Sequence, residues 1–426
     1  MATNTPEWLT GDFLKSCLED TEGNVAGVII TSYTLEPAIA PGNNYGSQMI
    51  RANVQYKRLD DSSTEESISL IIKAPLSEDS YIGDQFGDNF KQFYESESNY
   101  YHKFISETYR LSKHDVVPKH YKSPNPLCVV LEDLKASGFE MADRQKLLDF
   151  DHCELFIKAS AKLHALSMAI FKKDPGLIES LGVESPAMAE KMEKSFKLML
   201  PNSLLCMATY LEDKPDYKKQ FEIIKEACEE DVFWNIYKEM LEDCKSKPIR
   251  ALTQGDPWCT NMMFKYNSAG KVTDIKIIDF QNVRLCSPLV ELVFFLTASA
   301  NLEVRQKRLN DLYQIYCDSL NENLAEFECP ERLTMEELKA EIRFLSPIVF
   351  VNLCSLPVAL TDAVPDMTEF LTVKFSAESV NERSYYKSVY TGQYFNMNYP
   401  QILDAYDKHG VYDYMLKKIR EVKSEK

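Results

Sequence analysis

Three polar residues near the middle of the chain have the types and the spacing that phosphoryl transfer requires. Asp256 precedes Asn261 by five positions, and Asp279 comes directly after the apolar residues Ile277 and Ile278. In transfer from Mg-ATP, one carboxylate accepts or orients the proton of the attacking hydroxyl, while an Asn amide oxygen and a second Asp hold magnesium against the phosphates. The pattern therefore predicts Asp256 as the catalytic base and Asn261 and Asp279 as magnesium ligands.

A loop and a strand are expected to position these side chains. A loop of this length lets Asp256 and Asn261 point into one cleft, and the apolar residues 262–264 anchor it in a core. Residues 275–278 predict a short buried strand, and Asp279 leaves its end with the side chain directed at the metal. The alternative interpretation is a plain β-hairpin with acidic turn residues and no catalytic role.

The composition limits the classes of protein to which the chain can belong. It has 426 residues, 45% of them apolar, which indicates a globular protein of two lobes or domains. The net charge of −17 argues against nucleic acid or an anionic membrane as partner. No signal peptide or membrane-spanning run occurs, and the eleven cysteines include no C-x-x-C pair. These features predict a cytoplasmic protein with reduced thiols, and nothing indicates an obligate protein partner.

The N-terminal third has the pattern of a small sheet accompanied by helices. Apolar residues at helical spacing predict the helices, and runs rich in Val, Ile, Thr and Tyr predict the strands. The predicted elements are a helix within 1–20, strands at 25–35, 49–57 and 67–73, a helix at 86–107 and a strand at 127–131.

Lys73 closes the third of these strands, where a nucleotide kinase places the lysine that contacts the phosphates. Such a lysine needs a carboxylate to position it, and Glu97 lies within the apolar stripe of helix 86–107. A carboxylate on an inward face is costly unless it is paired. The sequence therefore predicts an ion pair between Lys73 and Glu97. Glu95 is the competing partner, and a solvated Glu97 at the edge of the stripe is the other alternative.

Two further segments are candidates for nucleotide binding. The turn between the first two strands contains Asn43, Asn44 and Tyr45, which are candidates to lie over the ATP phosphates. An ordinary hairpin turn explains the same composition. Glu132 and Leu134 follow the last of the strands, and their order in the chain places them at the hinge whose backbone groups bind adenine.

The C-terminal part is helical in pattern. An amphipathic helix at 151–169 carries His164 at a near-core position, where a histidine is more often a satisfied core residue than a catalyst. Glu291 opens an otherwise apolar helix, and a carboxylate buried there would accept backbone N–H bonds from the loop and hold Asp256. The lysine-rich end is expected to be a solvated tail (Lys417, Lys418, Arg420, Lys423 and Lys426).

The motifs recur in a fixed order along the chain. They are P-G-N-N-Y-G-S-Q-M-I-R (41–51), I-I-K-A-P (71–75), E-S-N-Y-Y (97–101), V-V-L-E-D-L-K-A-S-G-F (129–139), A-K-L-H-A-L-S-M (161–168), Q-G-D-P-W-C-T-N-M-M-F-K-Y (254–266) and I-I-D-F-Q (277–281). With this set the chain resembles the ecdysteroid kinase-like proteins of insects over nearly its whole length. Those proteins carry a CHK kinase-like domain, belong to the choline/aminoglycoside phosphotransferase-type kinases and are relatives of the protein-kinase fold.

The resemblance implies ATP- and Mg-dependent phosphorylation of a hydroxyl on a small molecule. Ecdysteroid hormones give the family its name, and detoxification of hydroxylated xenobiotics is a further expected role. Carried over position by position, the resemblance implies Asp256 as base, Asn261 and Asp279 as magnesium ligands, Lys73 as the phosphate-binding lysine and Glu97 as its partner.

The chain departs from the family pattern at two places. The family usually has His-Gly-Asp where this chain has Gln254-Gly255-Asp256, and Asp-Leu where it has Glu291-Leu292. Gln still forms hydrogen bonds, and Glu keeps the carboxylate with one more methylene. A loop displaced by about an ångström loses about a hundredfold in rate. Both changes favour a slow or altered enzyme, but neither removes the base or a metal ligand.

The predicted fold class is α+β, of the two-lobed protein-kinase-like type. A five-stranded antiparallel sheet with one helix forms the N-terminal ATP-binding lobe with the hinge (1–134), and the C-terminal lobe with catalytic loop and substrate pocket is mainly helical (135–426). The cleft between the lobes is expected to hold the site. Two alternatives stay open. One is a catalytically inert small-molecule binding protein on this fold, motivated by Gln254 and Glu291, and the other is a kinase of a choline- or aminoglycoside-like cation, motivated by the acidic charge.

Overall fold

The computed structural model describes most of the chain, in two compact units. The described residues are 6–19, 27–39, 47–60, 64–76, 91–183, 186–229, 231–360 and 393–424. The first unit is built from Met1–Met141, Lys173–Leu181 and Asn261–Val283, and the second from Ala142–Lys172, Gly182–Thr260 and Arg284–Lys426.

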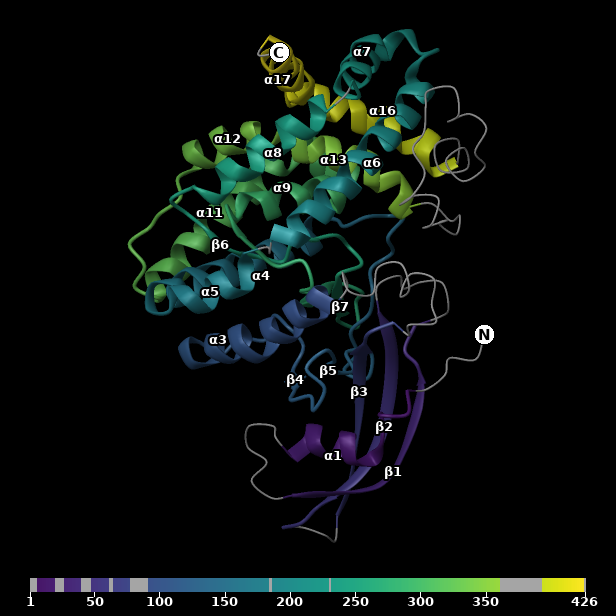
Figure 1. Ribbon diagram of the computed structural model, residues 1–426, viewed down its shortest axis with the longest axis vertical. Helices are drawn as coiled ribbons and strands as arrows, with labels where there is room; N and C mark the ends of the chain where they lie inside the picture. The colour runs from purple at the N-terminus through teal and green to yellow at the C-terminus, as the bar shows by residue number, and fades with distance from the viewer. Residues whose placement is uncertain are drawn as a thin grey trace. The chain divides into compact units, whose positions relative to one another are not determined.

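A five-stranded antiparallel sheet forms the centre of the first unit (Figure 1). Its strands lie in the order β1-β2-β3-β5-β4, and each neighbouring pair is antiparallel. The predicted five-stranded sheet is thus confirmed. The strands are β1 (Val28–Pro37), β2 (Gln48–Arg58), β3 (Glu65–Ala74), β4 (His120–Tyr121) and β5 (Val129–Glu132).

One face of the sheet is buried by helix α1 (Gly11–Glu19). In β2 the residues Ala52, Val54 and Tyr56 are buried at every second position, as expected for a strand with one covered face. Leu14 of α1 belongs to the same apolar cluster. The alternation that predicted the strands therefore also selects the face on which the helix packs.

The helix that carries Glu97 is described from residue 91. It continues from an α-helical part at 91–99 into the π-helical segment η1 (Tyr100–Ile105) and then into α3 (Ser106–Leu111). A π-helical turn changes which residues share a face, and four of the six residues of η1 are buried. The predicted apolar stripe is present at Tyr94, Tyr101 and Phe104. Phe86 and Phe90 lie outside the described residues.

A β-hairpin completes the first unit. Its strands β7 (Met262–Tyr266) and β8 (Val272–Ile277) pair antiparallel, with Met262 opposite Ile277. The bridge between Glu140 and Phe264 joins this hairpin to the segment that follows β5. The predicted short strand before Asp279 is thus present, and its partner strand begins directly after Asn261.

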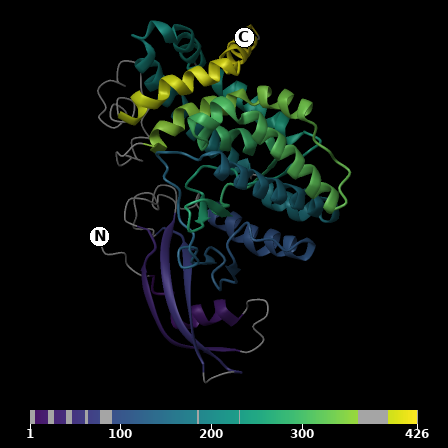
Figure 2. The same cartoon turned by 180° about the vertical axis from the view of Figure 1, so that it is seen from behind.

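The second unit is mainly helical, which confirms the predicted α+β class (Figure 2). Its two short strands, β6 (Ala251–Thr253) and β9 (Arg284–Cys286), pair antiparallel. The helices after β5, of which α5 spans the boundary between the units, are α4 (Phe150–Lys173), α5 (Pro175–Gly182), α6 (Pro186–Leu211), η2 (Pro215–Tyr217), α7 (Lys218–Ala227), α8 (Val232–Lys245), α9 (Leu289–Ala298), α10 (Leu302–Lys307), α11 (Leu309–Glu326), α12 (Met335–Phe344), α13 (Ser346–Leu360), α16 (Gln393–Lys408) and α17 (Val411–Ser424).

The expectation of a solvated lysine-rich tail is wrong for the described residues. Lys417, Lys418 and Lys423 belong to helix α17, which buries Tyr412 and Met415 on its apolar side and packs against α7, α8 and α13. Lys418 forms an ion pair with Glu239, and Lys423 with Glu226. The lysines thus form the outer face of an amphipathic helix, whose apolar spacing the basic composition concealed.

None of the helices in the described ranges has the length and apolar character needed to cross a membrane.

Candidate active site

Lys73 lies between two carboxylates in the first unit. Its Nζ is 2.6 Å from Oε2 of Glu97 and 2.6 Å from Oδ1 of Asp279. Glu97 is 1% exposed, whereas Glu95 is exposed and lies 3.9 Å from Lys91. The predicted ion pair of Lys73 with Glu97 is therefore present, and the competing partner Glu95 is excluded.

The triad formed by Lys73, Glu97 and Asp279 carries a net negative charge. Burial alone would lower the pKa of Lys73, but the charges of Asp279 and Glu97 raise it above its ordinary value, so the amine stays protonated. Burial raises the pKa of the Glu97 carboxyl, and Lys73 opposes that shift. The single ammonium group of Lys73 is thus paired with two carboxylates, those of Glu97 and Asp279. A further cation at Asp279 would be attracted to the site.

The backbone next to Asp279 is fixed by Glu97 and by aromatic packing. Oε1 of Glu97 accepts a hydrogen bond from the backbone N–H of Phe280 at 3.3 Å. The buried ring of Phe280 stacks on Tyr100, with centroids 4.1 Å apart and planes at 12°. Asp279 itself has a left-handed φ of 64°, which Asp tolerates better than most residues. Glu97 therefore positions both Lys73 and the turn that carries Asp279.

Asn261 and Asp279 lie at the same end of the β7–β8 hairpin. The backbone oxygen of Asn261 accepts a hydrogen bond from the N–H of Ile278 at 3.0 Å, and Met262 pairs with Ile277. An Asn amide oxygen and a carboxylate are hard oxygen donors. Mg²⁺ is usually held by one or two protein carboxylates together with substrate phosphates. This donor set, with the negative excess at Asp279, fits a magnesium ion that is bound together with a nucleotide.

The loop that carries Asp256 is held from inside the second unit. The backbone N–H of Asp256 donates to the side-chain Oε1 of Gln254 at 2.8 Å. The backbone N–H of Gln254 in turn donates to Oε2 of Glu291. Ser299 donates to the backbone oxygen of Pro257 at 3.4 Å. The expected hydrogen bond from the loop to Glu291 is present. The side chain of Gln254 in addition holds the backbone of Asp256.

Glu291 belongs to a buried polar cluster. Its Oε1 accepts a hydrogen bond from Ser160 at 2.5 Å and lies 3.5 Å from Nε2 of His164, whose Nδ1 is 3.0 Å from the hydroxyl of Tyr316. Burial alone would raise the pKa of Glu291, but the charge of His164 and hydrogen bonds from His164, Ser160 and the Gln254 backbone hold it below its usual value. Glu291 is thus an ionised support of the loop, and His164 is a satisfied core residue as expected.

Comparison with protein families decides the affiliation of the chain. The model of the ecdysteroid kinase-like family matches residues 41–329. The chain belongs to the ecdysteroid kinase-like family. This member of the family is a small-molecule kinase, and its structure is of the α+β class. None of the curated proteins searched matches its sequence.

Several solved structures are distantly similar to this ecdysteroid kinase-like chain. An ethanolamine kinase of Plasmodium vivax is 11% identical over 84% of this chain and 83% of that one, with a TM-score of 0.36. The gentamicin complex of APH(2'')-IIa is 13% identical over 72% and 94%, with a TM-score of 0.37. A choline/ethanolamine kinase family protein of Mesorhizobium loti is 11% identical over 88% and 92%, with a TM-score of 0.30. None of these likenesses bears on the substrate of this chain.

The structure brings some of the predicted nucleotide-site residues together. Lys73 and Glu97 form one cluster with Asp279, and Glu132 ends β5 opposite Leu70. Leu134 is buried with Phe139 and Met263, and the partly buried Ile278 packs against them. The predicted turn residues Asn43, Asn44 and Tyr45 lie outside the described residues. The roles of all these residues in nucleotide binding stay predictions.

Two supporting ion pairs were missed by the sequence analysis. Asp133 is 5% exposed and lies 2.6 Å from Nε of Arg51, and it accepts a hydrogen bond from Ser69 at 2.8 Å. The buried Lys276 of β8 pairs with Asp115. Asp133 stands directly between the two predicted hinge residues, and Lys276 interrupts an apolar strand. A charged residue inside an apolar segment was the available signal in both cases.

We expect Glu97→Gln to destabilise the protein and Glu95→Gln to leave it unchanged. Loss of the Glu97 charge leaves the buried Lys73 with one carboxylate, which costs about 1–3 kcal/mol of unfolding free energy. The exposed Glu95 is the matched control, with an expected change within about 0.5 kcal/mol. Urea unfolding of both variants measures the difference. Equal stabilities would contradict the structural role given to Glu97.

We expect Gln254→Ala to slow turnover while leaving ATP affinity unchanged. The variant removes the acceptor of the Asp256 backbone N–H, and a loop shifted by about an ångström loses about ten- to a hundredfold in rate. Steady-state kinetics and calorimetric ATP titration separate the two quantities. Gln254→His, which restores the residue usual in the family, should keep activity. A weaker ATP affinity with unchanged kcat would overturn this positioning role.

Proposed function

We propose that this chain transfers the γ-phosphoryl group of ATP to a hydroxyl of a small molecule, an ecdysteroid or a hydroxylated xenobiotic, with Mg²⁺ as cofactor. The observation that carries the proposal is the Lys73 ammonium held between Glu97 and Asp279, at 2.6 Å from each. A buried lysine paired in this way is suited to meet phosphate oxygens, and the family is one of small-molecule kinases.

Residues of the first unit are proposed to bind the nucleotide. Lys73 donates hydrogen bonds to phosphate oxygens, and Glu97 keeps its amine in place. Asn261 and Asp279 would hold Mg²⁺, which supplies charge neutralisation of the β- and γ-phosphates when it is bound. Their common position at the end of the β7–β8 hairpin supports this assignment.

Asp256 is proposed to act on the acceptor. Its carboxylate takes the proton of the acceptor hydroxyl while that oxygen forms a bond to the γ-phosphorus. The bond from the γ-phosphorus to the bridging oxygen breaks, and ADP leaves with the electron pair. Gln254 and Glu291 keep the loop in register for this step and are positioning residues.

The remaining assignments complete the proposal. Asn43, Asn44 and Tyr45 lie over the phosphates, and the backbone at Glu132 and Leu134 binds adenine. Residues 1–134 form the ATP-binding lobe, and 135–426 form the lobe with the catalytic loop and the substrate pocket. The protein acts in the cytoplasm. The polar support of Asp133 by Arg51 and Ser69 gives the proposed adenine segment a fixed backbone.

The proposal is tested by turnover on a panel of acceptors with Mg-ATP. The panel contains ecdysteroids, hydroxylated xenobiotics, choline and an aminoglycoside, and the readouts are ADP release and a phosphate ester found by mass spectrometry. Phosphorylation of a steroid or a xenobiotic is the expected result. Phosphorylation of choline or the aminoglycoside alone would replace the proposed substrate class. Ligand binding without any ester would favour an inert binding protein.

A further inference from the structure

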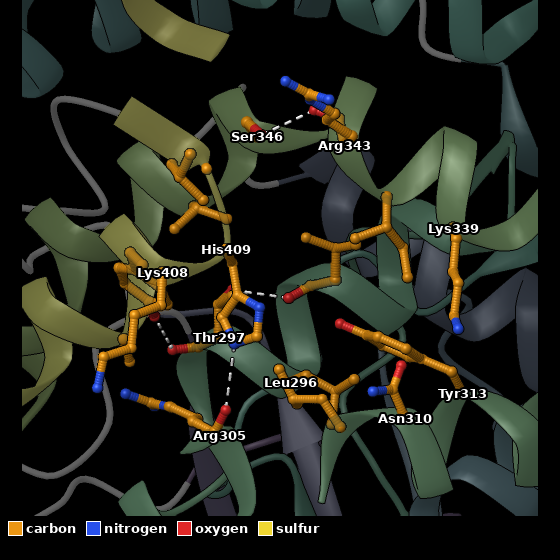
Figure 3. Close-up of a pocket in the computed structure, with 18 residues that line it drawn as sticks. Leu296, Thr297, Arg305, Asn310, Tyr313, Lys339, Arg343, Ser346, Lys408 and His409 are labelled. Atoms are coloured by element: carbon orange, nitrogen blue, oxygen red, sulfur yellow. Dashed lines mark hydrogen bonds between the residues drawn. The ribbon is translucent and has the colours of Figure 1, made fainter. Parts of the chain in front are cut away.

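A cavity of about 500 Å³ lies among the helices of the second unit (Figure 3). It is lined from α9, α11, α12 and α13, by Arg305 of α10 and by the end of α16 with the start of α17. Its volume is within the range of cavities that hold drug-sized ligands. It shares α9 with the Glu291 cluster, but none of the proposed nucleotide or metal residues that the structure describes lines it.

The charged groups on this cavity are of one sign. Among the described residues no carboxylate lines it, although the whole chain carries a net charge of −17. Figure 3 shows Arg305 and Lys408 on one side and Lys339 on the other. A local excess of positive charge in an acidic protein favours an anionic ligand. The basic residues that line the cavity are Arg305, Lys339, Arg343, Lys408 and His409.

Arg305 is the unusual member of this group. It is 2% exposed, and within the described part of the chain no protein acceptor is in hydrogen-bond reach of its Nε or of either terminal nitrogen. Its backbone oxygen, by contrast, lies 3.4 Å from Nε2 of His409. A buried charge without a partner is strongly unfavourable, so buried guanidinium groups are normally paired. The structure therefore leaves the five donors of this guanidinium available to a ligand.

A smaller cavity of about 240 Å³ also has Arg305 in its wall. Besides the guanidinium, it is lined by the carboxamides of Gln145, Asn301 and Asn398, by the carboxylate of Glu303 and by the ammonium of Lys146. The carboxylate of Glu303 disfavours an anion in this smaller cavity. The larger cavity adds three further cations at Lys339, Arg343 and Lys408, none of which has an ion-pair partner among the described residues. We therefore assign the anion to the larger cavity.

Apart from these cations and the polar side chains of Thr297, Asn310 and Ser346, the walls of the larger cavity are largely apolar. Leu296, Ile342 and Val349 line it, as do the rings of Tyr313 and Tyr406. The hydroxyl of Tyr406 is already used, since it donates to the backbone oxygen of Thr297 at 3.2 Å. Apolar walls with a few convergent charged groups fit a ligand with an apolar body and a charged end.

We propose that this cavity is a binding site for a small organic anion, in which Arg305 holds a phosphate, sulfate or carboxylate group and the apolar walls hold the body of the ligand. Its lining residues differ from the described residues that are proposed to bind the nucleotide and magnesium. The guanidinium forms paired hydrogen bonds to two oxygens of the anion, for which its planar fork is suited. Lys339, Arg343 and Lys408 add charge at the rim.

The test is a calorimetric titration of the full chain with three probes. They are dehydroepiandrosterone sulfate, dehydroepiandrosterone and inorganic sulfate, which represent the anion on its apolar body, the body alone and the anion alone. The joined probe should bind more tightly than either part, and saturating Mg-ATP should not displace it. Arg305→Met should weaken its binding about ten- to a hundredfold, as expected for lost hydrogen bonds to a charged group. Arg308→Met is the matched control, because Arg308 is paired with Asp311 and does not line the cavity.

Two further measurements make the test independent of how Arg305→Met folds. Without probe, this variant should be at least as stable as the wild type in urea, because it removes an unpartnered buried charge. Arg343→Met changes an exposed rim residue and should weaken the joined probe severalfold. Unchanged probe binding in both variants would overturn the proposal. Displacement of the probe by Mg-ATP, or loss of binding with Arg305→Met but not with Arg343→Met, would overturn the assignment to the larger cavity.

Discussion

Asp256→Asn is expected to lower the rate of phosphoryl transfer by about 10²–10⁴-fold and to leave ATP binding intact. A positioned general base contributes about that factor, and an amide cannot take the hydroxyl proton. The substitution keeps the shape of the side chain and the backbone N–H bond to Gln254 at 2.8 Å. The loss therefore belongs to the chemical step and not to the loop. Single-turnover kinetics with saturating Mg-ATP measure it directly.

Asp213→Asn is the matched control for this variant. Asp213 is exposed, lies in the same unit and undergoes the same change of charge. Its turnover should equal that of the wild type. Unchanged turnover of Asp256→Asn would exclude Asp256 as the base. A fall in ATP affinity equal to the fall in rate would place Asp256 in nucleotide binding instead.

The sequence predicted best the elements whose side chains repeat with a period. Residues 49–57 were predicted as a strand, and β2 spans Gln48–Arg58, because every second residue must face the core. The helix predicted at 151–169 corresponds to α4 (Phe150–Lys173) for the same reason, with helical spacing. Strand β4 has two residues, His120 and Tyr121, and so has no period to detect.

The part of the site that could be predicted from the sequence is the ion pair of Lys73 and Glu97. A carboxylate in an apolar stripe is costly unless it is paired, and a phosphate-binding lysine needs a carboxylate to position it, so the sequence predicted the pairing of Glu97 with Lys73. The third partner, Asp279, was assigned to metal only. Its contact with Lys73 depends on the left-handed turn at Asp279, which no side-chain pattern reveals.

Burial of isolated charged residues could not be predicted. Arg51 and Asp133 are 82 positions apart in the chain, and their contact follows from the pairing of β2, β3 and β5. Arg305 lies in a short helix with ordinary polar composition, and only the packing of α10 beside α16 shows that its guanidinium is enclosed. The sequence shows where charged residues occur, but it does not show which of them are buried or which lack an ion-pair or hydrogen-bond partner.

Asp279→Asn is expected to abolish the dependence of ATP binding on magnesium. In the wild type the triad of Lys73, Glu97 and Asp279 carries a net negative charge, so Mg²⁺ should tighten ATP binding. The amide removes one charged ligand and leaves Lys73 balanced by Glu97 alone. Affinity for Mg-ATP should fall about ten- to a hundredfold, as for the loss of a hydrogen bond or ligand contact to a charged group. Affinity for ATP without magnesium should change little.

Asp279→Asn removes the charge of the side chain and preserves the local structure, so a change in magnesium dependence can be attributed to the charge. Asn tolerates the left-handed φ of 64° at this position, so the turn and the stacking of Phe280 on Tyr100 should be kept. Asp274→Asn is the matched control, because Asp274 is an exposed carboxylate on β8, the strand that precedes Asp279. Calorimetric titration of ATP with and without Mg²⁺ on all three proteins gives the comparison. A magnesium effect of equal size in Asp279→Asn and the wild type would remove Asp279 from the metal site, because the ion would then be held without its charge.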